Sequence, residues 1–105
     1  MSNLAGAYLA MGDLGQAIPL YERTLADSER VLGADHPDTL LSRNNLAGAY
    51  AQAGRIDDAI TLLEQLVTDF ERVLGPEHPH TLSARHNLAL WREKAGDTAV
   101  HQPTD

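Results

Sequence analysis

One segment of this chain occurs twice at a fixed offset, and this repeat limits the possible folds more than any other feature. RVLGADHPDTL, from Arg30 to Leu40, returns as RVLGPEHPHTL, from Arg72 to Leu82, 42 residues later. About half of the positions in the first 42 residues recur in the next 42, which is far above chance for unrelated segments. A catalytic site is normally built once from scattered residues, so a repeated segment indicates a repeated structural unit.

Each period has the pattern of two helices. Apolar residues recur in steps of three and four from Ile56 to Leu74, which makes one continuous stripe along a helix. Gly75 and Pro76 follow, and proline cannot continue a helix. The preceding helical pattern stops at Gly54, which fits a left-handed C-terminal cap. Applied to the whole chain, these patterns predict five helices, at residues 2–11, 14–32, 38–53, 56–74 and 80–95.

The predicted helices form one domain of repeated units. The domain covers residues 1–96, with units at about 1–37 and 38–79 and a partial unit at 80–96, which makes two and a half repeats. Residues 97–105, which include Pro103, are expected to form a disordered tail.

The connector between the units explains the repeated phrase. RVLG closes one helix and HPxTL opens the next, because Pro37 and Pro79 suit the first turn, where no amide donor is needed. His36 and His78 precede these prolines, and we expect each imidazole to cap a helix end. A metal site is disfavoured, since the histidines lack the helical pairing of zinc sites and no cysteine assists them.

Composition excludes several classes of function. Eight basic and fifteen acidic residues give a formal net charge of −7, which argues against binding nucleic acid or anionic membranes. There is no cysteine, and no apolar run reaches the roughly 20 residues that cross a bilayer. We expect a cytoplasmic protein without metal or cofactor. Seven of the eight basic residues are arginine, and with abundant alanine and glycine this is typical of a GC-rich bacterial genome.

No catalytic arrangement can be recognised. The sequence offers no Ser-His-Asp pattern, phosphate-binding loop or metal cluster, so it predicts no enzymatic activity. Asp27 and Asp69 each precede an arginine by three residues. We expect these to be solvated ion pairs on a charged outer face, each contributing a few tenths of a kcal/mol.

The two-helix unit resembles the tetratricopeptide repeat. The residues that carry the resemblance are Leu46, Ala47, Tyr50 and Ala59, with Leu4, Ala5, Tyr8 and Ala17 one unit earlier. The period of 42 and the phrase LGxxHPxTLxxxNNLAxxY are similar to the long-helix class found in kinesin light chains. The resemblance implies an all-α fold of αα-hairpin repeats, stacked as a right-handed superhelical solenoid. It also implies a non-catalytic scaffold that binds a peptide or protein segment.

In that family the first helix of each unit lines a concave groove. At about 100° per residue, Asn3, Asn45 and Asn87 fall on this side of three successive first helices, as a ladder of amides. An amide offers a donor and an acceptor together, so it can pair with the backbone of an extended peptide. The alternative is that Asn45 bonds a neighbouring helix and fixes the spacing of the units. The full predicted groove set is Asn3, Leu41, Asn44, Asn45, Gln52, His86, Asn87, Leu90 and Lys94.

Self-association is the alternative function. A terminal repeat needs a polar outer face, and both ends of the array carry large apolar residues. Leu4 and Tyr8 lie on the short first helix, and Trp91 stands where the preceding unit has Ala49. These three residues are therefore candidates for packing at the ends or for stacking into a homo-oligomer.

Overall fold

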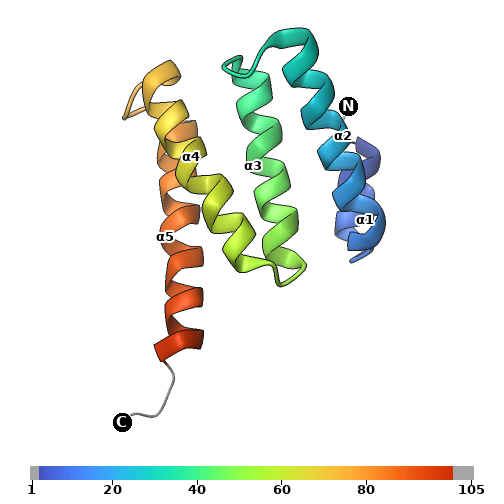
Figure 1. The fold of residues 1–105 in the computed structure, drawn as a ribbon, viewed down its shortest axis with the longest axis vertical. Coiled ribbons are helices and arrows are strands. Elements are labelled where there is room, and N and C mark those ends of the chain that lie inside the picture. Colours follow the sequence, from blue (N-terminus) through green and yellow to red (C-terminus); the bar gives the residue numbers. More distant parts are fainter. Residues whose placement is uncertain (1–2, 101–105) are drawn as a thin grey trace.

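The computed structural model describes the backbone of residues 3–100 and the side chains of residues 6–96. This part of the chain contains five helices and no strand, so the all-α prediction is confirmed. Figure 1 shows the helices running up and down in succession. Their bounds are α1 (Asn3–Ala10), α2 (Leu14–Leu32), α3 (Pro37–Gln52), α4 (Ile56–Leu74) and α5 (Pro79–Val100).

The helix limits agree closely with the sequence patterns, apart from one end. α2 and α4 have the predicted bounds, and α1 and α3 differ by one residue at each end. The fifth helix was expected to stop at Ala95, but it continues to Val100. Gly12 and Gly54 end their helices with positive φ angles of 79° and 82°, whereas Gly96 keeps the helical conformation. A glycine that keeps helical dihedral angles does not end a helix, and no proline enforces an end before Pro103.

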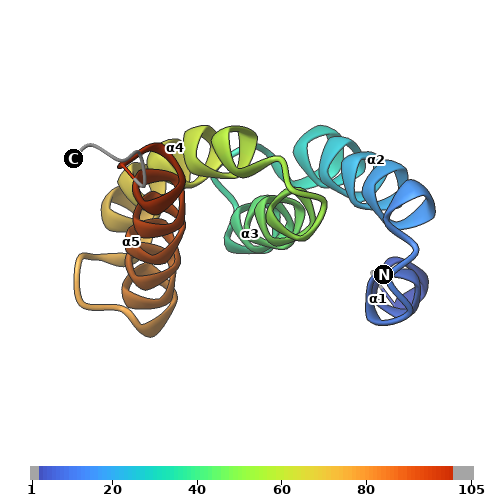
Figure 2. The same cartoon turned by 90° about the horizontal axis from the view of Figure 1, so that it is seen from below.

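The helices form two layers, with α1, α3 and α5 in one and α2 and α4 in the other (Figure 2). Each helix packs mainly against its neighbours in the sequence. The molecule measures 51 × 33 × 19 Å, and the smallest dimension is about two helix diameters. The layer of α1, α3 and α5 is called the inner layer below, because α3 is set back between α1 and α5 (Figure 2).

The core consists of two clusters that share α3. One side of α3 contributes Leu46 and Ala49 to a cluster with Ala17 and Tyr21 of α2. The opposite side contributes to a larger cluster with α4 and α5, made of Leu40, Ala47, Leu63, Leu66, Phe70, Ala84 and Leu88. Each hairpin therefore buries its apolar surface against the next one, as expected for stacked repeats.

The histidines of the connectors act as helix caps, as predicted. The Asp38 N–H donates to His36 Nδ1 at 3.1 Å, and the His80 N–H donates to His78 Nδ1 at 3.0 Å. Both donors lie in the first turn of a helix, where backbone N–H groups have no intrahelical acceptor. The repeated histidine and proline thus start α3 and α5 in the same way.

An ion-pair network fixes the α2–α3 connector to α4. Arg43 of α3 is 9% exposed. Its guanidinium donates to Asp69 Oδ2 at 2.7 Å and to the Ala34 carbonyl at 3.2 Å. Arg72 donates to both carboxylate oxygens of Asp35, at 3.0 and 2.9 Å, and to Asp69 Oδ1 at 3.0 Å. The network therefore joins α3, the connector and α4.

This network corrects one prediction from the sequence. Asp69 and Arg72 do form the expected pair, but Asp69 is partly buried and also holds the nearly buried Arg43. The spacing in the sequence predicts a solvated pair on the outer face at this position. The corresponding pair one repeat earlier, Asp27–Arg30, is exposed as predicted.

The arginines lower the pKa values of both carboxylates in the network. Burial raises the pKa of Asp69, but hydrogen bonds from Arg43 and Arg72 outweigh it and bring that pKa below its ordinary value. The pKa of Asp35 is lowered chiefly by the hydrogen bond from Arg72. Both aspartates are thus held in the charged form.

Replacing Asp69 by asparagine should destabilise the fold by about 2 kcal/mol, because Arg43 then keeps its charge in a nearly buried place without the carboxylate that accepts its hydrogen bond. Urea unfolding followed by circular dichroism measures the loss. Asp27, one repeat earlier, is the matched control. Its carboxylate is exposed, so Asp27→Asn should cost less than about 0.5 kcal/mol. Equal losses for the two variants would contradict the role given to Asp69.

The same network predicts how stability depends on pH. A carboxylate whose pKa is lower in the folded than in the unfolded chain stabilises the fold above the unfolded value, which is about 3.9. That contribution is lost as the pH falls through the folded pKa. The difference in unfolding free energy between the wild type and Asp69→Asn should therefore be constant from about pH 6 to 8 and shrink below about pH 4. A difference that grows on acidification would contradict this prediction.

Candidate functional site

The inner layer presents one row of side chains on each of its longer helices. On α3 the row consists of Leu41, Asn45, Gly48 and Gln52, and on α5 of Ser83, Asn87, Leu90 and Lys94. Steps of three and four residues keep each row on one side of its helix. Most members are exposed, whereas Leu41, Gly48 and Asn87 are half-buried. The rows are polar with one leucine each, so they offer both hydrogen-bonding groups and apolar contacts.

The asparagines of these rows have no hydrogen-bond partner within the described part of the chain. Asn45 is exposed and Asn87 is half-buried. The side chains of residues 6–96 contain no hydrogen bond from either amide to another helix. An amide that fixed the spacing of the units would need such a bond. The side chain of Asn3, the third predicted rung, lies outside the described residues.

The glycines of the inner layer are not equivalent. A Cβ placed on Gly48 would meet nothing within 4 Å, whereas one on Gly6 would lie 3.9 Å from the Tyr21 hydroxyl. Gly48 therefore leaves open space beside Asn45, and Gly6 already faces a neighbouring helix. This space allows another backbone to approach α3 closely.

Two of the predicted groove residues lie about 100° around the helix from the rows. Asn44 is half-buried, and its Oδ1 is buried without a hydrogen-bond partner. His86, the equivalent residue of α5, is exposed. Both residues lie at the edge of the inner face, and their role in peptide binding stays a prediction.

Two of the three candidates for self-association pack against the core of their own chain. Tyr8 is half-buried and packs against the α2–α3 cluster, and Trp91 is half-buried and packs against the larger cluster. The side chain of Leu4 lies outside the described residues. The contact of Trp91 with its own core favours packing within the chain, and its role in self-association stays a prediction.

Two equivalent hydrogen bonds join successive units, and neither was predicted from the sequence. The Tyr50 hydroxyl donates to Glu22 Oε2 at 2.8 Å, and Arg92 donates to Glu64 Oε2 at 2.9 Å. Arg92 stands 42 residues after Tyr50, so arginine replaces tyrosine and keeps the tie. Burial and the bond to Glu22 raise the pKa of Tyr50, and the Arg55 guanidinium lies 4.2 Å from its ring centre. Glu64 and Arg92 lie 42 residues after Glu22 and Tyr50, and this common offset was the signal in the sequence that could have predicted the second bond from the first.

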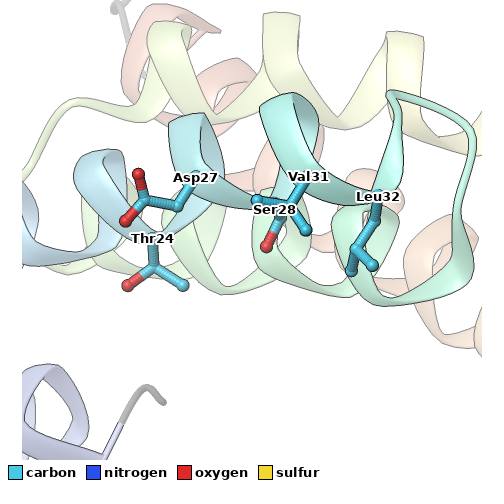
Figure 3. A pocket seen from close by; sticks show the side chains of 5 residues that line it. All are labelled: Thr24, Asp27, Ser28, Val31 and Leu32. Carbon is cyan, nitrogen blue, oxygen red and sulfur yellow. The ribbon is translucent and has the colours of Figure 1, made fainter.

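The outer layer, formed by α2 and α4, has two open hollows that the sequence did not predict. One, of about 290 Å³, lies along α2 and is lined by Thr24, Asp27, Ser28, Val31 and Leu32 (Figure 3). The other, of about 430 Å³, lies on α4 and is lined by Glu64, Gln65, Thr68 and Asp69. Figure 3 shows separate side chains along a single helix, with no converging set of polar groups. Neither hollow has the convergent polar groups of a small-molecule site.

The described residues offer neither a metal centre nor a membrane-spanning helix. They contain no group of three or more histidine, cysteine, aspartate or glutamate side chains that could hold a metal ion. None of the helices in this part of the chain has the length and apolar character needed to cross a bilayer.

Comparison with known proteins identifies the family. The model of the tetratricopeptide repeat matches residues 1–68 and 45–100, and no curated protein matches the chain. Two solved structures are similar: the nearly identical TPR-like repeats of a kinesin light chain from Podosopora anserina, and a variant of it. Each is 34% identical, has a TM-score of 0.83 and matches 91% of this chain. The match covers 46% and 45% of those chains, so this chain spans less than half of their length. The chain belongs to the tetratricopeptide repeat family.

Proposed function

We propose that the inner face binds an extended peptide or protein segment without performing chemistry on it. Repeats of this family generally mediate protein–protein interaction. The proposed site consists of the two inner rows, with Asn3 of α1 as a third rung. The observation that supports it most is that Asn45 and Asn87 occupy equivalent positions on neighbouring inner helices and have no hydrogen-bond partner among the described residues.

The chemistry of the rows suits a peptide in extended conformation. Each asparagine amide can donate to a backbone carbonyl and accept from a backbone N–H, whatever side chain the peptide carries. Gly48 leaves space for that backbone. Leu41 and Leu90, which is 37% exposed, provide apolar surface beside the amides, where peptide side chains can be buried. Sequence preference would then come from these leucines, and general affinity from the amides.

Replacing Asn45 or Asn87 by alanine should weaken peptide binding about five- to tenfold each, because one or two hydrogen bonds to the peptide are lost. The unfolding midpoint should stay unchanged, since neither amide bonds the fold. Peptides selected from a random displayed library, labelled with a fluorophore and followed by anisotropy, measure the effect.

Gln16→Ala is the matched control, because it removes an exposed amide from α2 in the outer layer. It should leave both binding and stability unchanged. If the library yields no binder, or if Asn45→Ala unfolds the protein, peptide binding at the asparagine ladder is wrong.

A second candidate function is self-association through the terminal units. The observation that favours it lies on α5, where the side chains facing away from α4 are exposed. Leu82 on this side is 49% exposed, whereas the equivalent Leu40 of α3 is 0% exposed. The cytoplasmic location and the bacterial origin stay predictions from composition.

A further inference from the structure

The side of α5 that faces away from α4 has residues typical of a buried helix face, but no other helix covers it within the described part of the chain. Leu82 and Ala89 are exposed, whereas the equivalent residues of α3, Leu40 and Ala47, are 0% and 1% exposed under α4. Arg85 is likewise exposed, and its equivalent Arg43 is buried. The equivalent face of α3 is therefore covered by α4.

The residues on this side are arranged symmetrically about Ala89. Leu82 and Arg85 lie seven and four residues before it, and Glu93 and Gly96 lie four and seven residues after it. At about 100° per residue these five positions fall within about 80° of the helix circumference. A Cβ on Gly96 would meet nothing within 4 Å, so there is room for a side chain of another molecule.

We infer that α5 pairs with α5 of a second copy of this chain, antiparallel and crossing at Ala89. A two-fold axis through this point places Arg85 of each copy opposite Glu93 of the other, and Leu82 opposite Gly96. Interfaces of this isologous kind are the commonest in homodimers. The inference deepens the second candidate function and is independent of peptide binding, because the inner rows lie on another side of α5.

Charge favours a second copy over an α4-like helix as the occupant. An α4-like helix could offer an acid to Arg85, as Asp69 does to Arg43. However, Glu93 stands where α3 has Ala51, which is buried. A helix that covered α5 as α4 covers α3 would bury the Glu93 carboxylate, and this is costly without a basic partner. A second copy instead supplies Arg85. Glu93 makes no ion pair within the described part of the chain.

Arg85 keeps one donor nitrogen available for the proposed pair. Its Nε and Nη2 donate to Glu71 Oε2, and Nη1 has no acceptor among the described residues. The interface would bury one short helix face on each copy, which is below the standard area of stable complexes. We therefore expect a weak dimer, with a dissociation constant in the micromolar range or above.

Sedimentation velocity of the intact chain from about 10 µM to 1 mM tests this pairing. The wild type should pass from the 11.4 kDa monomer to twice that mass. Arg85→Glu and Glu93→Arg should each raise the dissociation constant at least about tenfold, because two attractive pairs become repulsive. The double variant R85E/E93R should restore it, and so should an equimolar mixture of the two single variants.

Arg23→Glu is the control for charge, since Arg23 is exposed on α2 and should leave the dimer unchanged. Circular dichroism checks folding, and Glu93→Arg touches no contact within the chain. A monomer at every concentration would overturn both the pairing and the second candidate function. A dimer that resists the single reversals, or is not restored by the double one, would overturn the α5 pairing and leave self-association through other surfaces.

Discussion

The rest of the structure depends on the burial of α3 between α2 and α4. A two-helix unit of this size cannot cover its own apolar surface, so each inner helix must contact the outer helix before it and the one after it. Ala49 faces α2 and Ala47 faces α4, while Ala17 and Ala59 are fully buried at equivalent places on the outer helices. These small side chains let the helices approach closely, and that approach sets the spacing at which the inner rows repeat.

The ion-pair network adds direction to this packing. Apolar contacts alone tolerate small rotations of one hairpin against the next, whereas the bidentate pair of Arg72 with Asp35 and the bond of Arg43 to Asp69 require one geometry. The connector between α2 and α3 is thereby held against α4. None of the hydrogen bonds of the network involves Asn45, so the network stabilises the scaffold without occupying the amides of the proposed peptide site.

The helices could be predicted well from the sequence, because the residues that begin and end each helix lie within a few positions of its limits. Gly33 and Gly75 end α2 and α4 with positive φ angles, and the histidine and proline that start α3 and α5 lie within a few residues. The sequence did not predict contacts made across the fold. Arg43 and Asp69 are 26 residues apart, and the visible i,i+3 pairing of Asp69 with Arg72 concealed the bond to Arg43. The end of α5 was missed because Gly96, which occupies the position of Gly12 and Gly54 in the repeat, keeps the helical conformation.

Comparing α3 with α5 shows which residue types change when the packing around an equivalent position changes. Between α3 and α5 the residues facing the preceding outer helix stay buried, as Leu46 and Leu88 do. On the opposite side Ala51 is replaced by Glu93, and the tie to the preceding unit is kept although Arg92 replaces Tyr50. Asn45 and Asn87 are the same residue although their exposure differs, so packing against a neighbouring helix does not account for their identity. The proposed peptide, crossing both helices in an extended conformation, would require the same amide at both positions.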